Sequence, residues 1–363
     1  MLKLANLKVC FIAGTLGQGG AERQLYYILR ALWQSGASLR VLSLTRGEFW
    51  EKKIQELGIP VTWVGQQGSK LLRLARIVAA LRKQAPDVLQ SQHFYTNLYA
   101  VAAARALGLR EVGAIRCDGT SEVRDHGVVG GYLSLRAPRA MAVNSRAAIQ
   151  NAIALGAVAE RLCLLPNVVD TDHFKFVSRR EQGTIRLIAV GRLVEQKKLD
   201  LFLKMLARLR QRSRVPIRAT IVGEGEQRPQ LEQQARELGL LPDVVEFRGI
   251  VRDMNAVYRD ADILVLTSDW EGTPNVVLEA MASGLTVVAR PIGGVPEIIK
   301  HGETGFLTDS NDEDAIANSM LKLVIDSRLR MKIGRSAAEH VNANYSPRQL
   351  PSYLTDIYTG VLS

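Results

Sequence analysis

Cysteine is scarce in this 363-residue chain, and its three cysteines, Cys10, Cys117 and Cys163, form no C-x-x-C pair. The sequence therefore predicts neither a zinc ribbon nor a disulfide framework, and it suits a reducing compartment. Aromatic residues make up only 6% of the chain, which argues against the aromatic-interleaved basic runs of nucleic-acid readers. Uncharged apolar runs of about 18 residues and a signal-peptide-like segment are also lacking. We therefore expect a cytoplasmic location, no transmembrane span and no nucleic-acid partner.

Positive charge, by contrast, is abundant. The chain has 47 Lys and Arg residues against 36 Asp and Glu, a net charge of +11. Such an excess favours anionic partners, for example phosphorylated metabolites or an anionic bilayer surface. Segment 69–84 places cations around a stripe of Leu, Ile and Val. This pattern is typical of a helix that lies on an anionic membrane, and equally of a helix that packs on a sheet, so both interpretations stay open.

The main structural signal is an alternation of short Val-, Ile- and Leu-rich runs with amphipathic helical stretches. It extends from KVCFIA at residues 8–13 to LTVVA at residues 285–289. This alternation predicts parallel sheets covered by helices on both faces. Pro, Asn, Asp and charged residues interrupt it at residues 165–184. The sequence thus predicts two doubly wound, Rossmann-like α/β domains, residues 1–172 and 173–345, followed by a C-terminal helix at 346–363.

Loops that follow strands are the candidate binding sites, because open parallel sheets bind ligands where their strands end. The first such loop, GTLGQGGAE, ends at a helix start, where glycine amides favour an anion. Its glycine spacing is not that of a nicotinamide dinucleotide site. In the second domain the strand IRLIAV runs into GRLVEQKK, which places Arg192 and Lys198 beside the next helix. Two fixed cations there suit a diphosphate.

A second loop of this domain carries two glutamates. Glu271 and Glu279 follow the strand DILVLT, and Pro274 predicts that a helix starts between them. Glu279 should therefore lie one to two turns inside the helix, with Glu271 in the preceding loop. Paired carboxylates are also typical of glycoside hydrolases. The helix N-terminus beside them favours an anionic ligand instead.

Several segments, taken in order, resemble the retaining family 4 glycosyltransferases with the GT-B fold. They are GGAE, PNVVD, VGRL, IVGEGEQR, VEFRG and EGTPNVVLE followed by AMASG, and they extend from about residue 13 to residue 310. The resemblance implies two Rossmann-like domains that face each other across a cleft. The first would bind the acceptor and the second a nucleotide diphosphate-sugar such as a UDP-sugar. It also implies that the C-terminal helix packs back on the first domain.

The activity implied by this resemblance is that of a retaining, metal-independent hexosyltransferase without a cofactor. The acceptor would be a hydroxyl of a glycan or of a lipid-linked molecule, in bacterial surface polysaccharide or lipopolysaccharide biosynthesis. Such an enzyme would be cytoplasmic and could lie peripherally on the inner face of the plasma membrane through residues 69–84.

The resemblance also assigns roles to individual residues. Arg192 and Lys198 would clamp the diphosphate, Glu271 would hold the donor sugar, and Glu279 would bind the ribose. The remaining donor-binding candidates act mainly through backbone groups near the phosphates or the base: Gly19, Gly20, Gly223, Gly225, Arg248, Val251, Asn275 and Val276.

The first domain offers two further catalytic candidates, His93 and Asp118. Many relatives carry a histidine just after the strand equivalent to EVGAI, whereas this chain reads RCDG, so Asp118 is the local substitute. His93, after the strand DVLQ, resembles another histidine of the family, although a histidine at a strand end is often structural. In the family's mechanism the departing phosphate can itself take the acceptor proton. A side-chain base is therefore not required.

Two other functions stay open. One is a sugar-nucleotide epimerase or phosphorylase on the same fold, which we expect to lack the Glu271–Glu279 element in this form. The other is a catalytically weak, nucleotide-sugar-binding partner subunit, which the missing histidine makes conceivable. No metal site is predicted, because the two D-x-D matches, residues 170–172 and 260–262, lie in the interdomain segment and before a strand.

Overall fold

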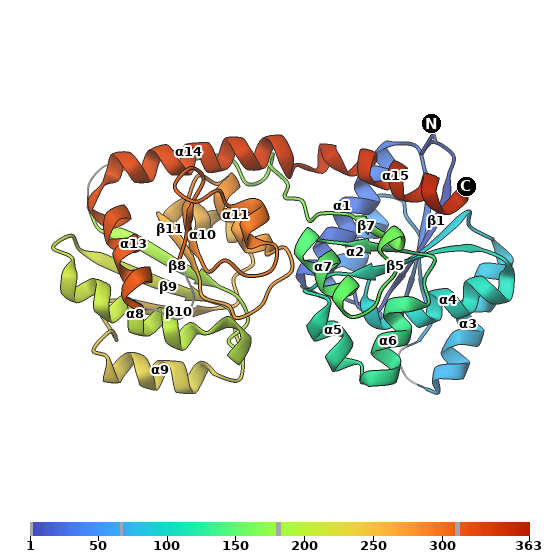
Figure 1. Cartoon of the computed structure of the whole chain (residues 1–363), viewed down its shortest axis with the longest axis horizontal. Helices are drawn as coiled ribbons and strands as arrows, with labels where there is room; N and C mark the ends of the chain where they lie inside the picture. Colours follow the sequence, from blue (N-terminus) through green and yellow to red (C-terminus); the bar gives the residue numbers. More distant parts are fainter. Residues whose placement is uncertain (1–2, 66–67, 179–182, 309–312) are drawn as a thin grey trace. The chain divides into compact units, whose positions relative to one another are not determined.

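The computed structural model describes residues 3–65, 68–178, 183–308 and 313–363 (Figure 1). The chain forms two compact units. Unit 1 comprises Met1–Val168 and Pro347–Ser363, and unit 2 comprises Val169–Ser346. The chain thus leaves unit 1 after Val168 and returns at Pro347. The sequence pattern predicts these two boundaries after residues 172 and 345 instead.

Unit 1 is built on a parallel sheet with the strand order β3-β2-β1-β4-β5-β6-β7 in the described residues. The order reverses at the centre, because β1 pairs with both β2 and β4. The strands are β1 (Lys8–Ala13), β2 (Ser38–Ser43), β3 (Val61–Trp63), β4 (Val88–Ser91), β5 (Arg110–Ile115), β6 (Ala140–Val143) and β7 (Leu162–Leu164).

Helices cover both faces of this sheet (Figure 1). One face packs against α1 (Gly20–Gln34), α2 (Phe49–Glu56) and α15 (Leu350–Leu362). The other face packs against α3 (Lys70–Lys83), α4 (Asn97–Leu107), α5 (Thr120–Asp125), α6 (Val128–Arg136) and α7 (Arg146–Ala154). Single turns of 3₁₀ helix are η1 (Phe94–Thr96), η2 (Ala159–Arg161) and η4 (Pro347–Gln349).

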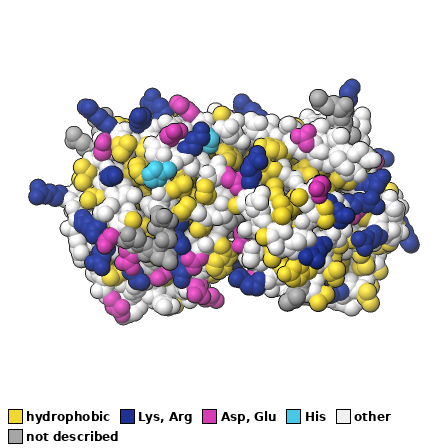
Figure 2. Space-filling view, in the orientation of Figure 1, with side chains coloured by type: hydrophobic (Ala, Val, Ile, Leu, Met, Phe, Trp, Pro, Cys, Tyr) yellow, Lys and Arg dark blue, Asp and Glu magenta, His cyan; other side chains and the backbone are white. Residues whose placement is uncertain are grey.

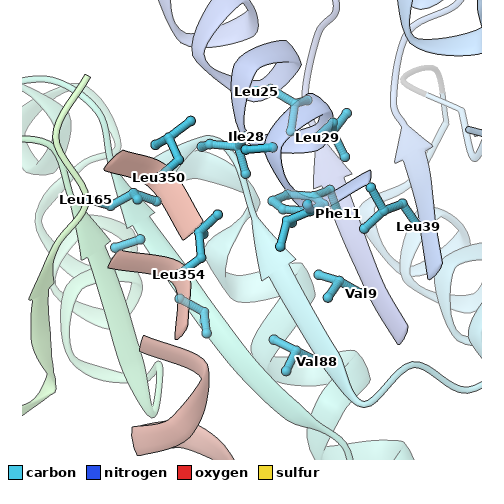
Figure 3. Close-up of a cluster of buried hydrophobic side chains, with 14 of the residues drawn as sticks. Val9, Phe11, Leu25, Ile28, Leu29, Leu39, Val88, Leu165, Leu350 and Leu354 are labelled. Atoms are coloured by element: carbon cyan, nitrogen blue, oxygen red, sulfur yellow. The ribbon is translucent and has the colours of Figure 1, made fainter. Parts of the chain in front are cut away.

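Side chains that alternate along β1 explain how one strand serves two cores. Val9 and Phe11 lie in the cluster shared with α1 and α15, whereas Cys10 and Ile12 lie in the cluster shared with α3 and α4. Successive residues of a strand point to opposite faces, so a strand buried on both faces must be apolar throughout. Figure 3 shows the first cluster, in which Leu354 of α15 lies among strand side chains.

Unit 2 repeats the plan with the strand order β10-β9-β8-β11-β12-β13 in its described part. Here the order reverses between β8 and β11. The strands are β8 (Ile185–Val190), β9 (Ile217–Val222), β10 (Val245–Gly249), β11 (Ile263–Leu266), β12 (Thr286–Ala289) and β13 (Phe306–Leu307). The helices are η3 (Glu195–Lys197), α8 (Leu199–Arg212), α9 (Arg228–Glu237), α10 (Met254–Asp260), α11 (Asn275–Ala282), α12 (Val295–Ile298), α13 (Glu313–Ile325) and α14 (Ser327–Asn344).

The predicted doubly wound α/β fold is confirmed, and each apolar run predicted to be a strand forms one. The helix predicted at 69–84 is α3, which begins after Ser69, whose side chain caps it. The sequence analysis missed β3 and β13. Both are edge strands of two or three residues, too short to show an apolar run. Among helices in the described ranges, none combines the length and apolarity that a membrane crossing needs.

The packing of α15 on unit 1 leads to a stability prediction. Leu354→Ala should lower the free energy of unfolding by about 2–5 kcal/mol, because it leaves a cavity at a fully buried site. The control Leu71→Ala removes the same atoms from a side chain that is 79% exposed, and it should cost less than about 0.5 kcal/mol. Urea unfolding followed by circular dichroism measures both. Equal losses would contradict the burial of α15.

Candidate functional site

The loops at the centre of each sheet are the structural starting point for a site. A reversal of strand order leaves a crevice between the loops that follow the two central strands. In unit 2 these loops are residues 191–198, after β8, and residues 267–274, after β11. The sequence-predicted residues Arg192, Lys198 and Glu271 all lie in them, and Arg192 is exposed.

An ion pair joins the two loops. Lys197 Nζ contacts Glu271 Oε1, and these side chains are only 17% and 11% exposed. Lys198, which the sequence analysis selected, takes the left-handed conformation (φ 47°) after η3, and its Nζ lies 3.7 Å from Asp269 Oδ2. The structure therefore favours Lys197 as the cation beside Glu271. Two adjacent lysines cannot be told apart in the sequence without knowing where this turn ends.

Hydrogen bonds to backbone carbonyls also join the same two loops. The amide of Asp269 donates to the carbonyl of Gln196 at 2.8 Å, and the Gln196 side chain donates to the carbonyl of Trp270 at 2.7 Å. The Thr267 hydroxyl donates to the carbonyl of Lys197 at 2.8 Å. Because these bonds fix both sides of the crevice, the Lys197 ammonium and the carboxylates opposite it are preorganised.

Glu279 lies inside α11, where Pro274 and the helical pattern place it. Its side chain is 3% exposed, and its Oε2 accepts a hydrogen bond from the Tyr258 hydroxyl at 3.0 Å. Asn275 and Val276 are the first two residues of α11. The start of this eight-residue helix thus lies close in the chain to a buried carboxylate, a combination suited to a ligand that carries both phosphate and hydroxyl groups.

Glycine is required where the neighbouring loops approach most closely. A Cβ on Gly223 would lie 1.9 Å from the Gly191 carbonyl oxygen, and one on Gly293 would lie 1.7 Å from that of Glu271. Gly225 is similarly close to the backbone of Leu193. The loops after β9 and β12 therefore lie directly against the two loops at the crevice.

The other base-contact candidates lie beside this cluster. Arg248 is exposed and pairs with Glu246 at 3.1 Å, while Val251 is half-buried against the core of α10 and α11.

In unit 1 a histidine links the loops that follow β1 and β4. The Gly14 amide donates to His93 Nδ1 at 3.1 Å, and His93 Nε2 lies 3.2 Å from Glu22 Oε1. Because Nδ1 accepts a hydrogen bond, the ring proton is on Nε2 and is directed at Glu22. His93 is therefore engaged at both nitrogens. Glu22 is the last residue of the GGAE segment, but the sequence pattern gives it no role; its carboxylate packs against Gly19, the residue before α1.

Asp118 has a structural task in the loop after β5. Its Oδ1 accepts a hydrogen bond from the Ser121 amide at 2.9 Å, which stabilises the start of α5. Next to it, Glu122 accepts hydrogen bonds from the amides of Arg116 and Cys117 at 3.0 and 3.2 Å. Burial nevertheless raises the pKa of Glu122 to about 7. Glu122, in the first turn of α5, is thus a second acid near this loop that sequence reasoning did not select.

Polar side chains also surround the loop after β1. Glu48 accepts hydrogen bonds from the Thr45 hydroxyl, the Leu16 amide and the Thr15 hydroxyl. Burial opposes its ionisation, but these donors outweigh it and lower the pKa of Glu48. Tyr95 stacks on His93 with ring centroids 5.3 Å apart. This edge of unit 1 therefore offers carboxylate and aromatic groups that suit a hydroxyl-rich ligand.

A metal centre has no support among the described residues, which contain no group of three His, Cys, Asp or Glu side chains that could hold an ion. Both D-x-D matches have local structural partners. Asp170 Oδ1 accepts from the Asp172 amide at 3.1 Å, and Asp262 Oδ2 accepts from the Arg186 amide at 2.8 Å.

Family models match both units. Residues 170–340 match the model described as glycosyl transferases group 1, and residues 18–173 match the model described as glycosyltransferase family 4. Relatives that are 30–32% identical match over stretches that span 39–66% of their own length.

Two relatives match over almost their whole length. The chain is 25% identical to GalNAc-α-(1→4)-GalNAc-α-(1→3)-diNAcBac-PP-undecaprenol α-1,4-N-acetyl-D-galactosaminyltransferase of Campylobacter jejuni, over 92% of this chain and 93% of that protein. It is 24% identical to the lipopolysaccharide core biosynthesis glycosyltransferase LpsE of Rhizobium meliloti, over 95% and 96%.

Among solved structures, HepE of Anabaena in complex with UDP-glucose has a TM-score of 0.82 at 22% identity, covering 97% of this chain and all of that one (100%). This likeness concerns the fold.

The close approach at Gly293 can be tested against a matched glycine. Gly293 and Gly302 both have positive φ, but a Cβ on Gly302 would meet nothing within 4 Å. Gly302→Ala should therefore cost only the backbone strain of about 1–2 kcal/mol. Gly293→Ala should cost a further ~1–3 kcal/mol, because the loop of Glu271 must shift. Chemical denaturation compares the two, and equal costs would show that the loops are not in contact there.

Proposed function

The chain belongs to the family 4 glycosyltransferases of the GT-B fold, and we propose that it is a retaining hexosyltransferase. It moves a hexose from a nucleotide diphosphate-sugar to a hydroxyl of a glycan or lipid-linked acceptor. The observation that carries the proposal is the Lys197–Glu271 pair, held in register at the central crevice of unit 2. It combines a cation for a phosphate with a carboxylate for sugar hydroxyls.

Unit 2 is the proposed donor domain. Arg192 and Lys197 carry the charge of the diphosphate, with Lys198 nearby, and the amides of Asn275 and Val276 bind the distal phosphate. As the bond from the anomeric carbon to the phosphate oxygen breaks, negative charge grows on the leaving group, and a fixed cation stabilises it. These protein cations take the part of a divalent ion, so the proposed reaction uses no metal.

Carboxylates orient the rest of the donor. Glu271 accepts hydrogen bonds from hydroxyls of the transferred sugar, and Glu279 accepts them from the ribose. The base lies near Gly223, Gly225 and the Arg248–Val251 segment, in contact mainly with backbone groups. UDP is the first base to test, because the similar Anabaena structures contain UDP or UDP-glucose.

Unit 1 is the proposed acceptor domain, and Gly19 and Gly20 at the start of its helix α1 are proposed to bind phosphate through their backbone amides. Both ring nitrogens of His93 already have partners, the Gly14 amide and the Glu22 carboxylate, and Asp118 supports a helix start. We therefore propose that His93 orders the glycine loop. The departing phosphate then accepts the proton of the attacking hydroxyl.

The acceptor proposal draws on the relatives. The names of the Campylobacter jejuni and Rhizobium meliloti relatives specify an undecaprenol-linked acceptor and lipopolysaccharide core biosynthesis. By analogy we place this chain in bacterial surface polysaccharide or lipopolysaccharide biosynthesis, on the cytoplasmic side of the membrane.

The two neighbouring lysines provide a direct test of the donor site. Lys197→Ala should lower turnover by about 10²–10³, since its interaction strengthens as the leaving group gains charge. The matched control Lys198→Ala should lower turnover less than about tenfold.

Glu279→Gln should instead raise the donor Michaelis constant about tenfold with turnover spared, because ribose does not change during the reaction.

The measurement is steady-state transfer or slow donor hydrolysis with UDP-sugars in excess EDTA. Full activity of Lys197→Ala with a confirmed donor would refute the site. A wild-type chain that binds donor without any turnover would instead indicate a partner subunit.

We also propose that the N-terminal end of α3 contacts an anionic membrane surface. Leu71 and Leu72 are 79% and 48% exposed there, and Arg76 lies over the exposed Trp63 ring. Figure 2 shows Lys and Arg side chains gathered with hydrophobic ones in this region of unit 1. Arg73 points elsewhere, because it donates to the Gly65 carbonyl and the Tyr99 hydroxyl at 3.0 and 2.8 Å.

Vesicle sedimentation tests this surface. The chain should sediment with anionic but not with neutral vesicles, and binding should weaken as salt screens the cations. The double variant Leu71→Glu with Leu72→Glu should abolish sedimentation. Ile325→Glu, which changes a 62% exposed side chain of unit 2, should leave it unchanged. Sedimentation of the double variant at the wild-type level would place the contact elsewhere.

A further inference from the structure

Arg290 is a largely buried cation behind the proposed donor site. It follows β12 and its side chain is 10% exposed. Its Nη1 donates to Asp269 Oδ1 at 2.7 Å and to the carbonyls of Thr267 and Ser268 at 3.3 and 3.1 Å. One guanidinium thus holds three successive residues of the loop that carries Glu271. Neither the sequence motifs nor the proposed donor contacts assign Arg290 a role.

Asp269 is the residue through which Arg290 reaches the site. While Oδ1 faces Arg290, Oδ2 lies 3.7 Å from the ammonium of Lys198. Asp269 is itself about one-third exposed, with a side-chain exposure of 29%. A carboxylate in this position repels a diphosphate and competes with it for the neighbouring lysines. The repulsion is reduced when a buried guanidinium neutralises the carboxylate.

We propose that Arg290 is a positioning residue that neutralises Asp269, so that the lysines of the loop after β8 stay available to the diphosphate. The inference rests on the proposed function. Without Arg290, Asp269 would repel the diphosphate and turn fully to Lys198.

A charge-rescue experiment separates this role from simple packing. Arg290→Gln should weaken UDP binding about tenfold in calorimetry and lower turnover by a similar factor. Adding Asp269→Asn removes the carboxylate that Arg290 neutralises, so the double variant should return to within about threefold of wild type. Asp269→Asn alone should also stay within about threefold. A packing role predicts no rescue, because the second change restores none of the lost volume.

Two further variants keep the outcome decisive. Arg290→Lys preserves the charge beside Asp269 and should retain UDP affinity within about threefold even if Arg290→Gln folds poorly. Arg218→Gln, an exposed arginine on β9, should leave binding unchanged. Folded single and double variants of equal weakness, or an Arg290→Lys variant as weak as Arg290→Gln, would overturn the inference alone. A wild-type chain that binds no nucleoside diphosphate would overturn the proposed function as well.

Discussion

The reversal of strand order at the centre of each parallel sheet is the constraint on which the rest of the molecule depends. Two neighbouring strands send their chains to opposite faces, so the loops after them separate at the carboxyl edge. Polar groups can enter there without breaking the sheet. In unit 2 the loops after β8 and β11 meet through Lys197 and Glu271. In unit 1 the loops after β1 and β4 meet through Gly14 and His93.

The two crevices differ in charge, and that difference separates their chemistry. The crevice of unit 2 holds cations paired with carboxylates, an arrangement that a diphosphate can enter by exchanging partners. The crevice of unit 1 holds a histidine whose two nitrogens are satisfied by an amide and a carboxylate. Buried charges persist only when paired and hydrogen-bonded. The partners of Lys197 and His93 are therefore as much a part of each site as the residues themselves.

Periodicity predicted most of the fold because strands buried on both faces must be apolar, as in KVCFIA and IRLIAV. It could not reveal β3 and β13, which are too short to carry a pattern. The spacing of Glu271 and Glu279 predicted that the first lies in a loop and the second inside a helix, since Pro274 fixes the helix start between them. The sequence pattern gave no role to Lys197, Glu22 and Arg290, because their roles depend on loop conformation and on strand neighbours. β11 and β12, for example, pair in space although their ends are far apart in the chain.

The positive charges that contribute to the net charge of +11 are balanced differently in the crevice of unit 2 and in helix α3. At the crevice of unit 2 the lysines already face carboxylates, so little of the excess is concentrated there. Helix α3, in contrast, has the sequence KLLRLARIVAALRK, which contains five cations and no acidic residue. Acidic residues within the helix itself do not balance these cations, and two of its leucines, Leu71 and Leu72, are exposed. The proposed donor site and the proposed membrane surface therefore use different residues, and each can change without the other.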